Sequence, residues 1–232
     1  MRLDRFLCEL NIGTRSQVKE LIKKGNVSVN GVIITKSDTN INETSDEVLF
    51  KGEKLRYREY VYIMINKPDG VVTATRDKNL PTVMDLIKPL PVKDMSPVGR
   101  LDRDTTGLLL ITNDGELSHR LLSPKYHVDK TYLVTCEHSL TENDINRLCE
   151  GVDIGDDEPT LPARVKTSNG TDILLTIHEG RFHQVKRMLE AVDNKVTKLK
   201  RVSFGPLDLP GDLKEGEWRE LTEDEIQKII FK

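Results

Sequence analysis

The stretch that most constrains the fold is residues 99–115, which read Gly-Arg-Leu-Asp-Arg-Asp-Thr-Thr-Gly-Leu-Leu-Leu-Ile-Thr-Asn-Asp-Gly. A charged segment around Asp102 leads into the unbroken apolar run Leu108–Ile111. Such a run is typical of a buried strand, and Asn-Asp-Gly at 113–115 is a strong turn signal. The sequence therefore predicts a charged loop that feeds a core strand of a sheet.

Asp102 has Arg100 two residues before it and Arg103 directly after it. A nearby guanidinium group favours the ionised carboxylate, and an ionised carboxylate in a water-poor pocket can act as a nucleophile or a base. The same pattern is also typical of a surface ion pair beside a strand. From these residues alone, both interpretations stay open.

The composition is that of an ordinary globular protein, with 37% apolar and 31% charged residues in 232. No apolar stretch approaches membrane-spanning length, and the N-terminus lacks the apolar core of a signal peptide. We therefore expect a cytoplasmic protein that does not bind a membrane. We expect no metal site, because the three cysteines are widely spaced and no two of the five histidines are four residues apart. We also expect no nucleotide cofactor, because the sequence has no glycine-rich phosphate loop.

Charge is distributed unevenly along the chain, although the net charge is only −3. The first 36 residues contain seven Lys or Arg and three Asp or Glu, whereas the other 196 residues carry a net charge of −7. Positive charge concentrated at one end is typical of a surface that binds phosphate groups.

Two short helices and a hairpin are predicted in this basic segment. Helical spacing covers residues 3–10, and Thr14-Arg15-Ser16-Gln17 is a capping box that opens a second helix, which ends at Gly25. Asn30-Gly31 between two Val-rich runs predicts a tight hairpin. Residues 37–59 read as a strand at 48–50 followed by a charged linker. The basic row on the second helix is equally typical of a solvated helix face.

Three further motifs follow in order. A strand at 61–65 precedes Asn66-Lys67-Pro68-Asp69-Gly70, a strand at 130–136 begins Lys-Thr-Tyr, and Gly180-Arg181-Phe182-His183-Gln184-Val185-Lys186 turns from a strand end into a helix. Short helices are predicted at 81–87, 117–122, 141–148 and 222–231, and a hairpin joins 163–166 to 173–177.

These motifs, together with Gly-Arg-Leu-Asp at 99–102, resemble those of the pseudouridine synthases that modify ribosomal RNA, and the N-terminal segment resembles the S4 RNA-binding domain. The similarity covers nearly the whole chain. It implies an α+β fold with a small helix-hairpin RNA-binding domain and linker at residues 1–59. A catalytic domain at residues 60–232 would follow, built on a mixed, mainly antiparallel sheet with flanking helices.

The resemblance also implies roles for single residues. Asp102 would be catalytic, Tyr132 would stack on the target base and relay a proton, and Lys186 would pair with Asp102. Arg100 would fill the space left when the base flips out. Lysine cannot make the bidentate fork of arginine, so Arg181 and Arg187 are alternatives opposite Asp102. The RNA-binding candidates are Arg2, Arg15, Ser16, Lys19, Lys23, Lys24, Asn30, Lys67, Arg103, Lys130, Arg181, His183, Gln184 and Arg187.

The implied reaction converts a uridine in RNA to pseudouridine without a redox change or a cofactor. The segments Asp104-Thr105-Thr106 and Ser118-His119-Arg120 resemble the small-subunit (16S) enzymes more than the large-subunit ones. We therefore expect a monomer that acts on 16S ribosomal RNA in a partly assembled small subunit. The alternatives are a 23S ribosomal RNA synthase of the same family and a non-catalytic RNA-binding assembly factor.

Overall fold

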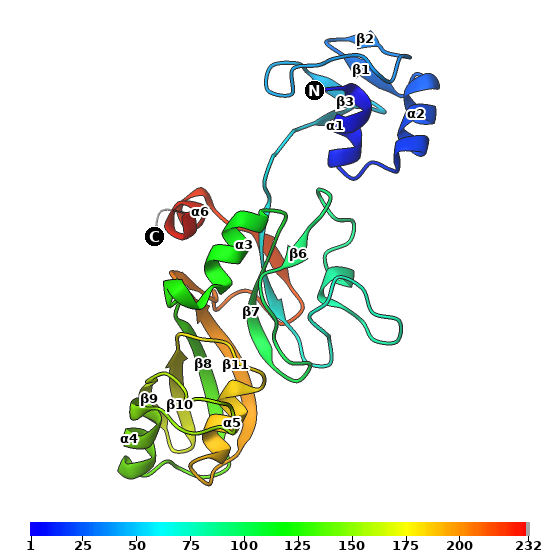
Figure 1. The fold of residues 1–232 in the computed structure, drawn as a ribbon. Helices are drawn as coiled ribbons and strands as arrows, with labels where there is room; N and C mark the ends of the chain where they lie inside the picture. Colours follow the sequence, from blue (N-terminus) through cyan, green and yellow to red (C-terminus); the bar gives the residue numbers. More distant parts are fainter. Residues whose placement is uncertain (231–232) are drawn as a thin grey trace. The chain divides into compact units, whose positions relative to one another are not determined.

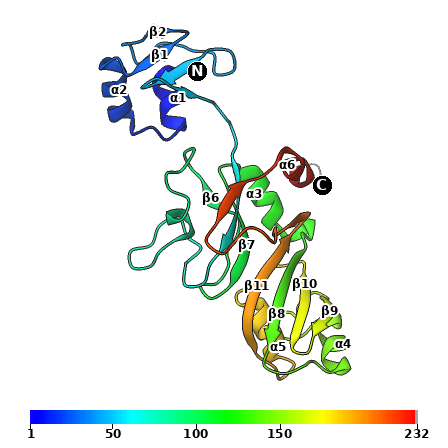
Figure 2. The same ribbon diagram turned by 180° about the vertical axis from the view of Figure 1, so that it is seen from behind.

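The computed structural model describes residues 1–230 of the chain (Figures 1 and 2). The chain forms two compact units. The first comprises Met1–Val61 together with Pro89–Met95, and the second comprises Tyr62–Lys88 and the chain from Ser96 onward. Residues 89–95 belong to the first unit through contacts such as the backbone hydrogen bond from Lys93 N to Glu9 O at 3.0 Å.

The first unit has two helices and a small sheet. The elements are α1 (Leu3–Glu9), α2 (Arg15–Lys23), β1 (Val27–Val29), β2 (Val32–Ile33), β3 (Val48–Phe50) and β4 (Glu53–Leu55). The sheet order is β2-β1-β3-β4. Thr14 caps α2 in a capping box with Gln17, as the sequence predicts, and Asn30 and Gly31 have the positive φ angles of a tight hairpin turn. Apolar residues of the helices and of β1 form one buried cluster.

The linker predicted for residues 51–59 is partly wrong, because β4 occupies Glu53–Leu55. Lys51 and Gly52 have φ angles of 50° and 86°, and this turn folds β4 back against β3. Strand β4 lies at the edge of the sheet, and its charged residues are exposed. Its sequence is therefore as polar as that of a linker in solvent, which is why the strand was not predicted.

The second unit is built on one large sheet with the strand order β13-β5-β7-β11-β8-β10-β9 among the residues described. The strands are β5 (Tyr62–Lys67), β7 (Thr106–Thr112), β8 (Lys130–Cys136), β9 (Arg164–Asn169), β10 (Asp172–Ile177), β11 (Val196–Phe204) and β13 (Trp218–Glu220). The short strands β6 (Ser96–Pro97) and β12 (Leu207–Asp208) pair with β7 and β11. Strand β11 pairs parallel with β7, and the other strand pairs are antiparallel. The mixed, mainly antiparallel sheet that the sequence predicts is confirmed.

Helices flank this sheet. They are α3 (Gly115–Leu122), α4 (Glu142–Glu150), α5 (Gln184–Glu190) and α6 (Glu223–Ile230), with 3-10 turns η1 (Val83–Asp85) and η2 (Pro124–Tyr126). The front and back views agree that α5 lies against one face of β8 and β11 (Figures 1 and 2). Apolar residues of α3 and α6 share a buried cluster with β5 and β7. No helix in residues 1–230 is long and apolar enough to cross a membrane.

The helix predicted at 81–87 is limited to the single turn η1. Thr82 and Asp85 form a capping box, in which the Asp85 carboxylate accepts from both Thr82 N and Thr82 Oγ1 at 2.8 Å. Prolines at 89 and 91 prevent the turn from extending into a longer helix. The predicted terminal helix is present as α6, and its predicted last residue, Phe231, lies outside the described residues.

Gly107 explains how β7 and β11 can pack side by side. Its φ angle is +104°, and a Cβ atom there would lie 2.2 Å from the backbone oxygen of Arg201. Arg201 is the partner of Gly107 in the parallel register. Only glycine permits this close backbone approach, so the glycine of the motif is required by packing against a strand more than 90 residues later.

Candidate active site

Asp102 lies in a tight turn just before β7. The backbone N of Thr105 donates to the carbonyl oxygen of Asp102 at 3.1 Å and closes the turn. On the N-terminal side, Thr73 Oγ1 donates to the carbonyl oxygen of Leu101 at 2.8 Å, and Leu101 N donates back to Thr73 Oγ1 at 3.2 Å. Both bonds are buried, so the backbone around Asp102 is held from two sides.

Lys67 supports the same loop from beneath. Its side chain is fully buried at the end of β5, and its Nζ donates to the carbonyl oxygens of Pro68, Arg103 and Thr105 at 3.1, 3.0 and 2.8 Å. Burial lowers the pKa of Lys67 to about 8. The sequence indicates Lys67 as an RNA-binding candidate, but its ammonium group lies inside the protein, where it holds the Asp102 loop.

Two side chains, Lys186 and His183, converge on the carboxylates of this loop. Lys186 Nζ, on α5, lies 3.3 Å from Asp102 Oδ2, and His183 Nε2 lies 3.5 Å from Asp102 Oδ1. The same Nζ also donates to both oxygens of Asp104, at 2.7 and 2.8 Å. Asp102 is 29% exposed and Lys186 is 22% exposed at the side chain, so the site is partly shielded and still reachable from solvent.

The charges at this site favour the ionised forms. Burial opposes the charge of Lys186, but its hydrogen bond to Asp104 and the charges of Asp102 and Asp104 outweigh burial and raise the pKa of Lys186 above its usual value. The hydrogen bond from Lys186 lowers the pKa of Asp104. Lys186 is therefore a fixed cation shared by two carboxylates, and Asp104 belongs to the site although it is not among the site residues predicted from the sequence.

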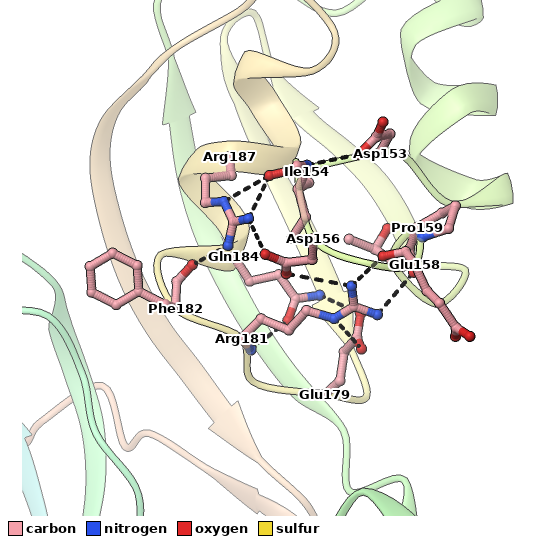
Figure 3. A network of polar contacts seen from close by, with 12 residues as sticks. Asp153, Ile154, Asp156, Glu158, Pro159, Glu179, Arg181, Phe182, Gln184 and Arg187 are labelled. Carbon is pink, nitrogen blue, oxygen red and sulfur yellow. Dashed lines mark hydrogen bonds and ion pairs between the residues drawn. The ribbon is translucent and has the colours of Figure 1, made fainter.

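A dense polar network holds the turn that precedes α5 (Figure 3). Arg181 donates to Glu179 Oε2 and to the carbonyl oxygens of Glu158 and Pro159, at 3.0, 2.6 and 2.9 Å. Gln184 accepts from Arg181 N at 3.0 Å and donates to Glu179 Oε1 at 2.8 Å. The guanidinium group of Arg181 thus binds the protein's own acidic loop, residues 152–159.

Arg187 completes this network. It donates to the carbonyl oxygens of Ile154 and Phe182, both at 3.0 Å, and pairs with Asp156. The pairing with Arg187 lowers the pKa of Asp156. Both arginines bind residues 154–159, Glu179 or Phe182, whereas Lys186 Nζ lies 3.3 Å from Asp102 Oδ2, so the structure favours Lys186 among the three candidates for that position.

Tyr132 is on β8, and only 8% of it is exposed. Its partners across the sheet are Arg201 on β11 and Leu175 on β10. Because residues opposite one another in register share a face, these side chains line the same face of the sheet. On the other side of β11, Arg201 pairs with Gly107 of β7, the strand that follows Asp102. Strand β11 therefore lies between β8, which carries Tyr132, and β7.

Arg201 and Lys130 form a buried cationic pair next to Tyr132. Arg201 is 2% exposed, and its Nε donates to the carbonyl oxygen of Leu108 at 2.8 Å. Its guanidinium lies 4.7 Å from the centre of the Phe204 ring, and Lys130 Nζ lies 5.6 Å from the same ring. Burial, with a smaller contribution from Arg201, lowers the pKa of Lys130 to about 8. Arg201 is not among the site residues predicted from the sequence. The sequence shows it only as one cation within residues 199–204, where apolar and polar residues are mixed.

The remaining candidates of the second unit lie at the surface. Arg100 is exposed, and Arg103 Nε donates to the carbonyl oxygen of Gly70 at 3.2 Å, which ties the Asp102 loop to the turn after β5. In residues 1–230, no group of three or more His, Cys, Asp or Glu side chains is arranged to hold a metal ion.

In the first unit, the RNA-binding candidates of α2 and its C-terminus are exposed: Arg15, Ser16, Lys19, Lys23 and Lys24. Two other candidates have structural partners. Asn30 Nδ2 donates to Asp46 Oδ1 at 3.0 Å, and Asn30 Oδ1 accepts from Glu47 N at 2.9 Å. The guanidinium of Arg2 binds both oxygens of Asp4, and this hydrogen bond lowers the pKa of Asp4.

Comparison with known proteins agrees with this arrangement. Residues 61–191 match the RNA pseudouridylate synthase family, and residues 1–48 match the S4 domain. An uncharacterized RNA pseudouridine synthase of Bacillus subtilis is 46% identical over 99% of this chain and 98% of its own length. Ribosomal small subunit pseudouridine synthase A is 44% identical in Haemophilus influenzae, covering 99% and 100% of the two chains, and 38% identical in Escherichia coli, again covering 99% and 100%.

A solved structure supports the fold assignment. A crystal structure of a pseudouridylate synthase superposes with a TM-score of 0.71 at 41% identity, covering 99% of this chain and 100% of that one. The family match includes Asp102, Tyr132 and Lys186, and the relatives match over both the S4 segment and the catalytic unit. The chain therefore belongs to the RNA pseudouridylate synthase family, in the group that carries an N-terminal S4 domain.

Proposed function

We propose that this enzyme converts one uridine of small-subunit (16S) ribosomal RNA to pseudouridine. The bond between C1′ of the ribose and N1 of uracil is broken, and C1′ is joined to C5 of the same base. C5 loses its proton and N1 gains one, so atoms and electrons balance without an oxidant or a reductant. The names of the small-subunit relatives, which align over nearly their whole length, support this choice of RNA.

The contact between Asp102 and Lys186 carries the proposal. These residues are 84 positions apart in the sequence, and the fold brings Lys186 Nζ to 3.3 Å from Asp102 Oδ2. A carboxylate held by a fixed cation on a partly shielded loop is suited to nucleophilic or base catalysis. Asp102 starts the isomerisation, and Lys186 holds its carboxylate in place.

Two other residues complete the proposed machinery. Tyr132 offers an aromatic surface and a hydroxyl group in the same sheet, so that it can stack on the extruded base and relay a proton. Arg100 is exposed two residues before Asp102 and occupies the space that the flipped base leaves in the RNA. Because base extrusion separates the uridine from its neighbours, the enzyme needs both a pocket for the base and a filler for the gap.

RNA recruitment is assigned to the basic row on α2. The exposed side chains of Arg15, Lys19 and Lys23 recur every four residues on the helix, and Ser16 and Lys24 flank them. Such a row binds phosphates with little dependence on base identity. We propose that it anchors a monomeric enzyme on ribosomal RNA in a partly assembled small subunit in the cytoplasm.

The test is pseudouridine mapping with wild type and Asp102→Asn. Both proteins are incubated with unmodified 16S and 23S RNA, naked and as partly assembled subunits, and pseudouridine is located by carbodiimide-dependent stops of reverse transcription. We expect one stop in 16S RNA with wild type and none with Asp102→Asn, which should still bind RNA. Stops only in 23S RNA would overturn the substrate choice. No stop with intact RNA binding would favour a non-catalytic assembly factor, and turnover by Asp102→Asn would refute its role.

A further inference from the structure

Phe182 is the most exposed of the large apolar side chains in the described part of the chain. It is 75% exposed, in the turn between β10 and α5. Phenylalanine is usually buried, because exposing an aromatic ring to water costs roughly 1.5–3 kcal/mol. A single exposed ring needs no explanation by itself, but this one is two residues from Gln184 and four from Lys186, in the motif that builds the active site.

The backbone at Phe182 is firmly held. Its carbonyl oxygen accepts a hydrogen bond from Arg187 Nη1 at 3.0 Å, and the preceding residue, Arg181, is fixed by the network of the acidic loop. In Figure 3 the ring of Phe182 points away from this network. The protein thus presents the ring from a rigid turn, which reduces the entropy that a ligand must overcome when it contacts the ring.

The ring also lies next to the catalytic loop. It stacks on the imidazole of His183, with centroids 3.9 Å apart and an interplanar angle of 16°. His183 Nε2 is in turn 3.5 Å from Asp102 Oδ1. One aromatic residue therefore separates the exposed ring from the carboxylate that reacts.

We infer that Phe182 is a stacking platform for a nucleobase that flanks the target uridine. The inference rests on the proposed function. When a uridine is extruded, its neighbouring bases lose a stacking partner, and an exposed aromatic face beside the reaction centre replaces that partner. Base-to-aromatic stacking tolerates any sequence, so Phe182 contributes binding and positioning of the RNA without reading the base.

A purely structural role predicts a different outcome. In that case Phe182 would only support His183, which has a left-handed φ angle of +48°, and the ring would not contact RNA. Substitution would then change the chemical step through His183 and leave RNA binding unaltered. The two roles are separated by comparing kcat with KM and by a probe placed at position 182 itself.

The experiment uses full-length protein and 16S ribosomal RNA, both as naked transcript and in partly assembled small subunits. Phe182→Leu keeps an apolar side chain without a ring, and Phe182→Tyr keeps the ring. We expect Phe182→Leu to lower kcat/KM by about 10- to 100-fold, mainly through KM, and Phe182→Tyr to restore it to within about threefold. Circular dichroism verifies folding, which an exposed position should not disturb.

A fluorescence experiment reports stacking directly. Trp218 is the only tryptophan, so Phe182→Trp in a Trp218→Phe background places the single indole at the proposed platform, and the unmodified background protein serves as the control. Quenching of the indole emission at saturating RNA supports the inference. Unchanged emission, or a Phe182→Leu effect confined to kcat, overturns it. If wild type modifies no RNA, the proposed function fails, whereas the fluorescence result still decides whether Phe182 stacks on RNA.

Discussion

Replacing Gly107 with alanine should strongly destabilise the catalytic unit, because two effects act together there. The residue has a φ angle of +104°, which a side chain rarely adopts, and the new Cβ would lie 2.2 Å from Arg201 O and 2.7 Å from Arg201 N. The obstacle is backbone rather than a flexible side chain. Strands β7 and β11 would have to separate at the one place where they pair.

The magnitude follows from these two effects. A strained backbone conformation costs about 1–3 kcal/mol, and overpacking that shifts the backbone costs about 1–3 kcal/mol. Breaking the hydrogen bonds between β7 and β11 adds about 0.5–1.5 kcal/mol for each bond. We expect the free energy of unfolding to fall by about 3–6 kcal/mol, a large part of the 5–15 kcal/mol that is typical of a domain.

The assay is urea denaturation followed by the emission of Trp218, which lies in the same unit on β13. Gly70→Ala is the matched control: its φ angle is +79°, but a Cβ there meets nothing within 4 Å, so it measures the backbone strain alone. We expect Gly70→Ala to cost about 1 kcal/mol. If Gly107→Ala is no less stable than Gly70→Ala, the argument from close strand packing is refuted.

Three other predictions concern charged groups. Lys186→Met should slow pseudouridine formation about 100- to 1000-fold, because Lys186 would no longer contact Asp102. The free energy of unfolding should change by less than about 1 kcal/mol, because a partly exposed ion pair contributes little stability. A near-normal single-turnover rate would contradict this prediction. The pKa of Lys67 is about 8 in the folded state and 10.5 when unfolded, so in this window the unfolded chain binds more protons and stability rises with pH. Relative to Lys67→Met, wild type should gain up to about 3 kcal/mol between pH 7 and 10.5 in urea titrations, and parallel pH profiles would exclude the effect. For Glu225, whose hydrogen bond with Arg219 lowers its pKa from 4.5 to about 2, the sign is opposite. Its contribution, which solvent screening of this partly exposed pair limits to about 1 kcal/mol, is present above pH 4.5 and is lost as the pH falls to 2, so wild type and Glu225→Gln should converge in stability near pH 2.

Local signals in the sequence predicted local structure well. The capping box at Thr14, the hairpin at Asn30-Gly31 and the apolar run before Asn113 each lie within a few residues, and each forms the expected element. These signals work because the hydrogen bonds and backbone angles that they specify are satisfied within the segment itself. Resemblance to a known family also predicted that Lys186 would lie opposite Asp102, and that contact is present.

Long-range structure was harder to predict. Strand β11 is central to the large sheet, yet residues 196–204 read Val-Thr-Lys-Leu-Lys-Arg-Val-Ser-Phe, with three cations and only four apolar residues in nine. A central strand is expected to be apolar. Here Arg201 finds partners in the fold: its Nε donates to the carbonyl oxygen of Leu108 and its guanidinium packs on Phe204, and the first of these partners cannot be identified before the strands are paired.

The site residues that sequence reasoning missed or misassigned share this origin. Lys67 looked like a surface cation after a strand, but three carbonyl oxygens of the folded loop make its burial possible. Asp104 looked like a mere neighbour of Asp102, the proposed catalytic residue, but α5 brings Lys186 to both carboxylates. In each case the partner is a backbone atom or a side chain supplied by a distant segment, so the residue type alone could not reveal the role.

Gly107 shows how such long-range packing can build the site. Near it in sequence is Asp102, whose turn leads directly into β7; across the sheet is Arg201, whose other neighbour is Tyr132. A residue larger than glycine would push β11 away from β7 and would move Tyr132 relative to Asp102. The glycine that appears in the sequence as a break in a charged loop therefore fixes the distance between the carboxylate and the strand that carries the proposed stacking tyrosine.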